Sequence, residues 1–211
     1  MPRLRLLCLH GFRGSGAALR TQMQGAFGEL EPQVELVCPD APSLADGRSG
    51  WWNAVAIDGQ APPIKHYEGW QRTRDAIVQL FATSGPFDGI FGFSQGAALA
   101  GLLVGMRAAD RRVTTEQPLC FGFAILVSGF MSNDPTHDAL YAAAASYALP
   151  SLHLIGGADR IVVPEASRAL AERFEKPQLV EHDGGHVIAS TLEVKHALRR
   201  FLAGQSASLA V

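Results

Sequence analysis

The stretch that decides the fold covers residues 87–107 and reads FDGIFGFSQGAALAGLLVGMR. Its first part is apolar and rich in β-forming residues, whereas its second part is rich in Ala and Leu, so it predicts a buried strand followed directly by a helix. The junction, Gly92-Phe93-Ser94-Gln95-Gly96, matches the G-x-S-x-G pattern of a serine on a tight strand-to-helix turn. A side chain at either glycine would collide with neighbouring backbone. The stretch therefore predicts an exposed Ser94 hydroxyl at the edge of a sheet, where a helix begins.

On both sides of this stretch, short apolar runs alternate with segments of helical spacing. We expect strands at residues 4–9, 34–38, 87–92, 121–127, 152–155 and 178–181, and helices at residues 17–27, 69–83, 95–107, 139–146, 165–174 and 192–202. Continuous apolar strands that alternate with helices are typical of a parallel sheet covered on both faces. The sequence thus predicts a single α/β domain over residues 1–203, with about six mostly parallel strands and helices on both faces. Residues 40–63 are expected to be irregular and residues 204–211 to form a flexible tail.

The composition excludes several classes of protein. Hydrophobic residues make up 47% of the 211 residues, charged residues 18%, and the formal net charge is −2. This balance excludes disorder as the main state, and it lacks the basic excess with which nucleic-acid-binding proteins neutralise phosphates. Cys8, Cys38 and Cys120 form no zinc-binding pattern and are expected to be free thiols in a reducing compartment. Because the apolar runs are too short for a signal peptide or a membrane span, we expect a cytoplasmic protein.

The residues after the later strands supply partners for the serine. A serine hydroxyl is a weak nucleophile until a base takes its proton. In proteins whose serine lies on such a strand-to-helix turn, called the nucleophile elbow, the acid and the histidine follow the serine in that order. Asp159 comes after the fifth expected strand, and His186 comes after the sixth, behind the flexible pair Gly184-Gly185. We expect Ser94, Asp159 and His186 to form a catalytic triad. Less favoured candidates for the base and the acid are His182, Asp134 and Asp138.

Acyl transfer also needs hydrogen-bond donors for the oxyanion that forms on the carbonyl. In proteins with this elbow, one donor is the backbone N–H of the residue after the serine, here Gln95, and the other lies in the loop after the first strand, where Phe12 is the expected donor. Four apolar residues after the second and fourth strands could line an acyl pocket, although core packing is an equally good interpretation: Trp51, Trp52, Phe130 and Met131. This chemistry needs neither a metal ion nor an organic cofactor.

Several motifs together resemble the FSH group, the "family of serine hydrolases" within the α/β-hydrolases. These motifs span most of the chain and are CLHGFR (8–13), GWW (50–52), GPFDG (85–89), GFSQGAAL (92–99), VSGF (127–130), DRIVVP (159–164) and GGH (184–186). The resemblance implies an α/β-hydrolase fold with the strand order 2-1-3-4-5-6. It also implies a carboxyl-ester hydrolase that acts on alkyl or acyl esters through Ser94, Asp159 and His186. Some members of this family release acyl chains from thioesters.

We interpret the sequence as a serine esterase that forms a covalent acyl-enzyme and acts on a small-molecule ester or thioester. One alternative is an acyl thioesterase resembling the acyl-protein thioesterase/carboxylesterase family, which shares the Gly-Phe-Ser-Gln-Gly elbow. Another, from a different class, is a non-catalytic protein that binds small molecules on the same fold. That alternative is disfavoured because such proteins often lose a member of the triad, whereas this chain keeps all three in the expected order. Neither nucleic acid nor a membrane span is expected, and the oligomeric state stays open.

Overall fold

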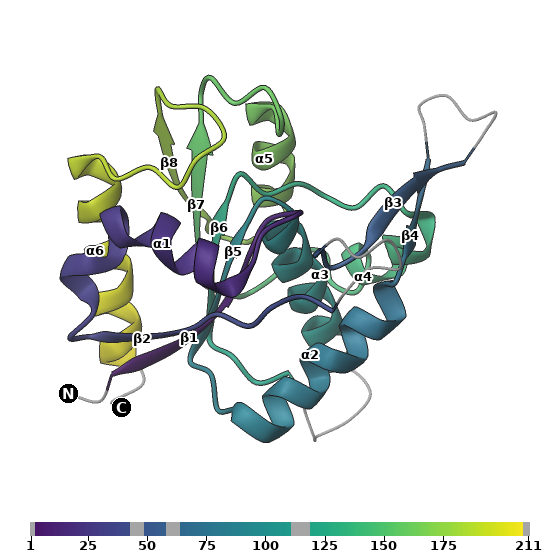
Figure 1. The fold of residues 1–211 in the computed structure, drawn as a ribbon, viewed down its shortest axis with the longest axis horizontal. Coiled ribbons are helices and arrows are strands. Elements are labelled where there is room, and N and C mark those ends of the chain that lie inside the picture. Colours follow the sequence, from purple (N-terminus) through teal and green to yellow (C-terminus); the bar gives the residue numbers. More distant parts are fainter. Residues whose placement is uncertain (1–2, 43–48, 58–63, 111–118, 209–211) are drawn as a thin grey trace.

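The computed structural model describes residues 3–42, 49–57, 64–110 and 119–208 (Figure 1). Its centre is a parallel sheet in the order β2-β1-β5-β6-β7-β8, which confirms the strand order predicted from the sequence. The strands are β1 (Leu4–Leu9), β2 (Val34–Val37), β5 (Gly89–Phe93), β6 (Phe123–Val127), β7 (Ser151–Gly156) and β8 (Gln178–His182). Because all six run in one direction, the loops that follow them meet at the same edge of the sheet.

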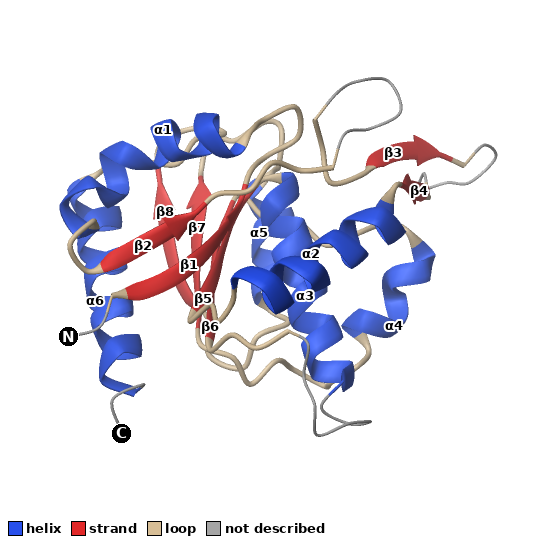
Figure 2. Cartoon of the chain, turned by 60° about the horizontal axis from the view of Figure 1, so that its bottom comes forward, coloured by secondary structure: helices blue, strands red, loops and turns tan. Residues whose placement is uncertain are grey.

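Helices cover both faces of this sheet (Figure 1, Figure 2). The helices of one face are α1 (Gly16–Phe27) and α6 (Leu192–Ser208), and those of the other are α2 (Trp70–Ser84), α3 (Gln95–Asp110), α4 (Asp138–Tyr141) and α5 (Pro164–Ala171). Two short 3₁₀ helices are η1 (Gly28–Leu30) and η2 (Pro135–His137). Successive side chains of a strand point to opposite faces, so β1 sends Leu6 and Cys8 into one apolar cluster and Leu7 and Leu9 into the other. Burial on both faces explains why the central strands β5 and β6 are continuous apolar runs.

A small antiparallel hairpin lies outside the main sheet, and the sequence analysis did not predict it. Its strands are β3 (Asn53–Ala56) and β4 (Lys65–Glu68), with Asn53 opposite Glu68 and Ala54 opposite Tyr67. Part of it falls within residues 40–63, which were expected to be irregular. Each strand has only four residues. β3 is apolar but mostly exposed, and β4 is mostly polar, so the pair gives a weak strand signal. In Figure 1 the hairpin extends from the body of the molecule on the side of α2 and α4.

Two helices differ most in length from the prediction. Two others differ by less, since α3 continues to Asp110 and α5 ends at Ala171. α6 continues to Ser208 instead of ending at Leu202, so residues 204–208 are helical and do not belong to the flexible tail that was predicted; residues 209–211 lie outside the described residues. The segment after Leu202 contains no proline, and its small residues are compatible with a helix. α4 ends at Tyr141 because the chain turns away, and Tyr147 then pairs with Phe174 in an isolated bridge. No helix within the described residues is long and apolar enough to cross a membrane.

Candidate active site

Three strand ends bring Ser94, His186 and Asp159 into one hydrogen-bonded row. Ser94 follows β5, Asp159 follows β7 and His186 follows β8, so their meeting point is the edge of the sheet where ligands bind in open α/β folds. The Nε2 atom of His186 lies 2.9 Å from the Oγ atom of Ser94, and its Nδ1 atom lies 2.7 Å from the Oδ2 atom of Asp159. Nucleophile, base and acid are therefore within hydrogen-bond reach of one another.

The turn that carries Ser94 is strained and depends on its two glycines. Ser94 has a φ of 55°, a left-handed conformation that non-glycine residues rarely adopt. A Cβ atom at Gly92 would lie 2.3 Å from the carbonyl oxygen of Gly96, and one at Gly96 would lie 2.1 Å from the carbonyl oxygen of Leu9. The amide of Ser94 donates to the carbonyl of Val127 on β6, 2.9 Å away. The turn is thus held by tight backbone packing that leaves no room for a side chain at either glycine.

The carboxylate of Asp159 is buried and accepts hydrogen bonds on both oxygens. Its Oδ1 atom accepts from the amides of Ile161 and Val162, each at 2.9 Å, and its Oδ2 atom faces His186. Burial pushes the pKa of the Asp159 carboxyl up, but the hydrogen bonds from His186, Val162 and Ile161 outweigh it and hold this pKa below its ordinary value. An ionised carboxylate can only accept hydrogen bonds, so Nδ1 of His186 donates to it. In the neutral imidazole, Nε2 is then free to accept the Ser94 proton.

The less favoured candidates lie elsewhere and have other partners. The Nδ1 atom of His182 accepts a hydrogen bond from the amide of Gly184, 3.1 Å away, and burial lowers the pKa of His182. Asp134 is buried beside the hairpin, where its Oδ2 atom accepts from the amide of Tyr67 at 2.7 Å. Asp138 is the first residue of α4. The structure therefore brings Asp159 and His186, rather than these residues, to Ser94.

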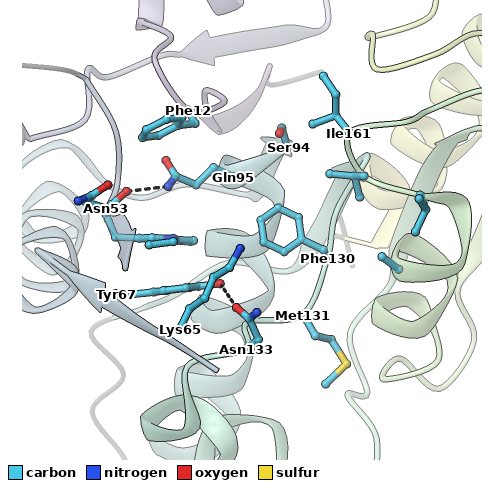
Figure 3. Close-up of a pocket in the computed structure, with 15 residues that line it drawn as sticks. Phe12, Asn53, Lys65, Tyr67, Ser94, Gln95, Phe130, Met131, Asn133 and Ile161 are labelled. Atoms are coloured by element: carbon cyan, nitrogen blue, oxygen red, sulfur yellow. Dashed lines mark hydrogen bonds between the residues drawn. The ribbon is translucent and has the colours of Figure 1, made fainter. Parts of the chain in front are cut away.

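A pocket of about 700 Å³ opens beside Ser94 (Figure 3). The two residues expected to act as oxyanion donors, Phe12 and Gln95, line it. Three of the four apolar residues expected to line an acyl pocket also do so: Trp52, Phe130 and Met131. The volume is within the range of small-molecule sites. Its walls are mostly apolar, as a site for an acyl chain requires.

Trp51 lies outside this pocket, contrary to the prediction that it could line an acyl site. It is 1% exposed, and its indole N–H donates to the carbonyl of His10, 2.7 Å away. Its amide donates to Oε1 of Gln95 at 3.0 Å, while Nε2 of Gln95 donates to the carbonyl of Trp52 at 2.8 Å. The Gln95 side chain thus holds both tryptophans, and these bonds turn Trp51 into the core and leave Trp52 in the pocket wall.

The backbone near Ser94 fits the expected oxyanion donors. Gln95 is the first residue of α3, where backbone N–H groups have no acceptor within the helix. Phe12 lies in the loop after β1, and its neighbour Gly11 approaches the serine closely, since a Cβ atom there would lie 3.4 Å from the Cβ atom of Ser94. Phe12 is 42% exposed although it is a large apolar residue. Its position is thus at the mouth of the pocket and not in the core.

Several pocket residues were missed in the sequence analysis. They come from the hairpin, from the loop after β6 and from the segment after Asp159, and they are Asn53, Ala54, Lys65, Tyr67, Asn133, Ile161, Val162, Val163 and Ala166. The apolar run Ile161-Val162-Val163 directly after Asp159 is a sequence signal that could have indicated a wall of the site. In the structure Ile161 is 75% exposed, so this run is not part of the core. The hairpin residues carried no such signal.

Comparisons with known proteins support the fold described above. The arrangement of sheet, elbow and later acid and histidine is that of the α/β-hydrolase fold. Solved structures share it: SOBER1 from Arabidopsis thaliana aligns with a TM-score of 0.66 at 21% identity, covering 97% of this chain and 100% of that one. Acyl-protein thioesterase 2 from Zea mays aligns with a TM-score of 0.65 at 17% identity, covering 96% and 94%.

Residues 1–198 match the serine hydrolase (FSH1) family, and the chain belongs to this family. This confirms the resemblance inferred from the motifs, which look most like the ovarian-tumour-associated serine hydrolase of the family. Esterase OVCA2 from Danio rerio is 33% identical over 226 residues, which cover 94% of this chain and 96% of the relative. Family membership supports hydrolase activity of the esterase or thioesterase type.

Proposed function

We propose that the chain is a serine esterase that hydrolyses carboxylic esters through Ser94, His186 and Asp159. The observation that carries this proposal is the hydrogen-bonded row of these three side chains, which ends at a pocket lined by apolar residues. The strained elbow supports it, because a residue held at φ 55° by tight packing is typical of a functional position.

In the first half of the reaction, Nε2 of His186 takes the proton from Oγ of Ser94, and Oγ forms a bond to the ester carbonyl carbon. The electron pair of the carbonyl π bond moves to oxygen, and the N–H groups of Gln95 and Phe12 stabilise this oxyanion. One such donor is worth about 3 kcal/mol in the transition state. When the oxyanion collapses, the bond to the alcohol oxygen breaks, and His186 gives its proton to that oxygen. The alcohol leaves, and the acyl group stays on Ser94.

In the second half, water takes the place of the alcohol. His186 removes a proton from water, the resulting hydroxide attacks the acyl carbon, and the second oxyanion collapses with release of the Ser94 oxygen, which regains the proton from His186. Asp159 keeps Nδ1 of His186 protonated and stabilises the imidazolium that forms in each half. Each step uses only the substrate, water and this chain's own residues.

The test is hydrolysis of a series of neutral p-nitrophenyl esters by the wild-type protein and by Ser94→Ala. We expect turnover by the wild type and a loss of at least a thousandfold in Ser94→Ala, with both proteins equally folded by circular dichroism. A matched oxygen ester and thioester of the same acyl chain separate an esterase from an acyl thioesterase. Tight binding of esters without turnover in the wild type would contradict the proposal and favour a non-catalytic binding protein.

A further inference from the structure

We propose that Lys65 selects esters whose acyl chain ends in an anionic group such as a carboxylate. This inference rests on the proposed esterase function and names the substrate class for it. The preferred substrate is thus a half-ester of a dicarboxylic acid, with an apolar chain between the reacting carbonyl and the free carboxylate.

The charge distribution of the pocket points to an anionic ligand group. Among the described residues that line the pocket, Lys65 is the one charged side chain, and the others are apolar or neutral polar residues. Within the described residues, no carboxylate forms an ion pair with Lys65. A lysine ammonium has three hydrogen-bond donors and no acceptor. A positive charge among apolar walls is best satisfied by an anion that enters with the ligand.

The nearby acidic residues already have other partners. Oε2 of Glu68 accepts from the side chain of Asn53 at 3.5 Å, and Glu68 does not line the pocket. Asp134 accepts from the amide of Tyr67 and from Thr136, and its Oδ2 atom lies 3.2 Å from Nδ1 of His66. Both carboxylates therefore have partners other than Lys65.

The contacts of the hairpin hold the strand that carries Lys65. Lys65 and Tyr67 are two residues apart on β4 and therefore lie on the same face of the strand. The Tyr67 ring stacks on Trp52 with centroids 4.6 Å apart and planes 9° from parallel, and its hydroxyl donates to Oδ1 of Asn133 at 3.2 Å. The amide of Lys65 donates to the carbonyl of Asn133 at 3.1 Å. With the strand held in this way, the Lys65 side chain extends into the pocket (Figure 3).

The same geometry assigns the anion to the acyl part of the ester. The leaving alcohol oxygen must reach Nε2 of His186 to receive its proton. Phe12, Ser94 and Gln95 line the pocket, whereas His186 does not, so we assign the pocket to the acyl chain. Trp52 and Phe130 would contact the methylene groups of that chain, and Lys65 would pair with the carboxylate at its end.

The test compares p-nitrophenyl half-esters of dicarboxylic acids of increasing length with neutral isosteres in which the free carboxylate is methylated. At low ionic strength we expect the wild type to prefer the best half-ester over its isostere about tenfold or more in kcat/KM. We expect Lys65→Met to lose this preference, and Lys65→Glu to prefer a chain that ends in an ammonium group. The preference should shrink as salt is added, because salt screens the charge pair.

Two controls separate this inference from its alternatives. Lys176→Met removes the same charge from an exposed position before β8, outside the pocket lining, and should keep the wild-type preference. A third substrate carries the carboxylate on the alcohol and should show no preference that depends on Lys65. Equal preference in wild type and Lys65→Met, or a Lys65-dependent preference for the alcohol-side anion, overturns the inference. Ser94-dependent hydrolysis of the neutral isosteres shows in either case that the esterase proposal stands; if no ester is hydrolysed, both fall.

Discussion

The row of Ser94, His186 and Asp159 and the β3–β4 hairpin meet at the same pocket, but they are built in different ways. The row stands on strands of the main sheet, and every residue of β5 and β7 is buried. Tyr67 is the one fully buried residue of the hairpin strands. The proposed chemistry thus rests on the rigid core, whereas the proposed recognition rests on an appended element. Such an element can change without disturbing the sheet, as is common for loops that carry specificity.

A few specific contacts hold the hairpin. They are the ring stacking of Tyr67 on Trp52 and the hydrogen bonds that Asn133 and Asp134 accept from β4. Substitutions in the two regions should therefore have different consequences: at the row they should reduce the rate of the chemical steps, and at the hairpin they should mainly weaken substrate binding.

Asp159→Asn should have the largest effect. The amide would no longer hold Nδ1 of His186 protonated or stabilise the imidazolium, so kcat should fall by about 10³- to 10⁴-fold. The measurement is steady-state hydrolysis of a neutral ester, with Asp183→Asn as the control, because Asp183 is exposed and lies three residues before His186. Full activity of Asp159→Asn would show that the carboxylate has no part in catalysis.

Gly92→Ala should destabilise the folded protein. The new methyl group would lie 2.3 Å from the Gly96 carbonyl oxygen and 2.5 Å from Cα of Ala97, both backbone atoms that cannot easily move. We expect a loss of about 3 kcal/mol in the free energy of unfolding, measured by urea denaturation. Gly28→Ala is the control, since its Cβ would meet nothing within 4 Å, and this variant should be at least as stable as the wild type. Equal stability of both variants would contradict the account of the elbow.

Asp134→Asn should affect the hairpin and not the chemistry. Removing the charge weakens the bonds from Tyr67 and Thr136 to a buried acceptor, at a cost of about 2 kcal/mol in stability. We expect KM for the best ester to rise severalfold, with a much smaller change in kcat. The wild-type and variant kinetics should be compared on the same ester. A fall in kcat as large as that of Asp159→Asn would remove the distinction between the two regions.

The pH dependence of stability should show a smaller effect, from His153 in the core of the sheet. Burial lowers the pKa of His153 to about 3, whereas the unfolded chain has a histidine pKa of about 6.5. The native histidine stays neutral while the unfolded one takes up a proton, so its contribution to stability is present above pH 6.5 and is lost as the pH falls toward 3. Between pH 7.5 and 5.5, wild type should lose about 1.4 kcal/mol more stability than His153→Gln. Parallel pH curves from urea titrations would contradict this assignment.

The positions around the serine could be predicted because their signals are local. Gly92 and Gly96 flank Ser94 at a strand-to-helix junction. Asp159 and His186 each follow a predicted strand, so the alternation of elements brings them to one edge of the sheet. The structure places their side chains within hydrogen-bond distance. The order of the six strands was implied by the resemblance to the FSH group, because alternation alone does not fix which strands are neighbours.

The rest depends on contacts between residues far apart in the chain. β4 has no apolar pattern of its own, and Asp134, 67 residues beyond Tyr67, helps to hold it. Trp51 and Trp52 are neighbours of the same type, yet Trp51 is turned into the core and Trp52 faces the pocket because of bonds to His10 and to the Gln95 side chain. The extension of α6 to Ser208 adds turns of helix where the sequence contains a glycine and small polar residues, which are weak signals in either direction.

The most direct test of the central claim is covalent labelling with a fluorophosphonate, which reacts with activated serine nucleophiles. The labelled wild-type protein is digested, and the modified residue is located by mass spectrometry, with Ser94→Ala and Asp183→Asn labelled in parallel. The account predicts a single adduct on Ser94 in wild type and Asp183→Asn, and none in Ser94→Ala. Folded wild-type protein that stays unlabelled at Ser94, or that carries the adduct on another serine, would contradict it.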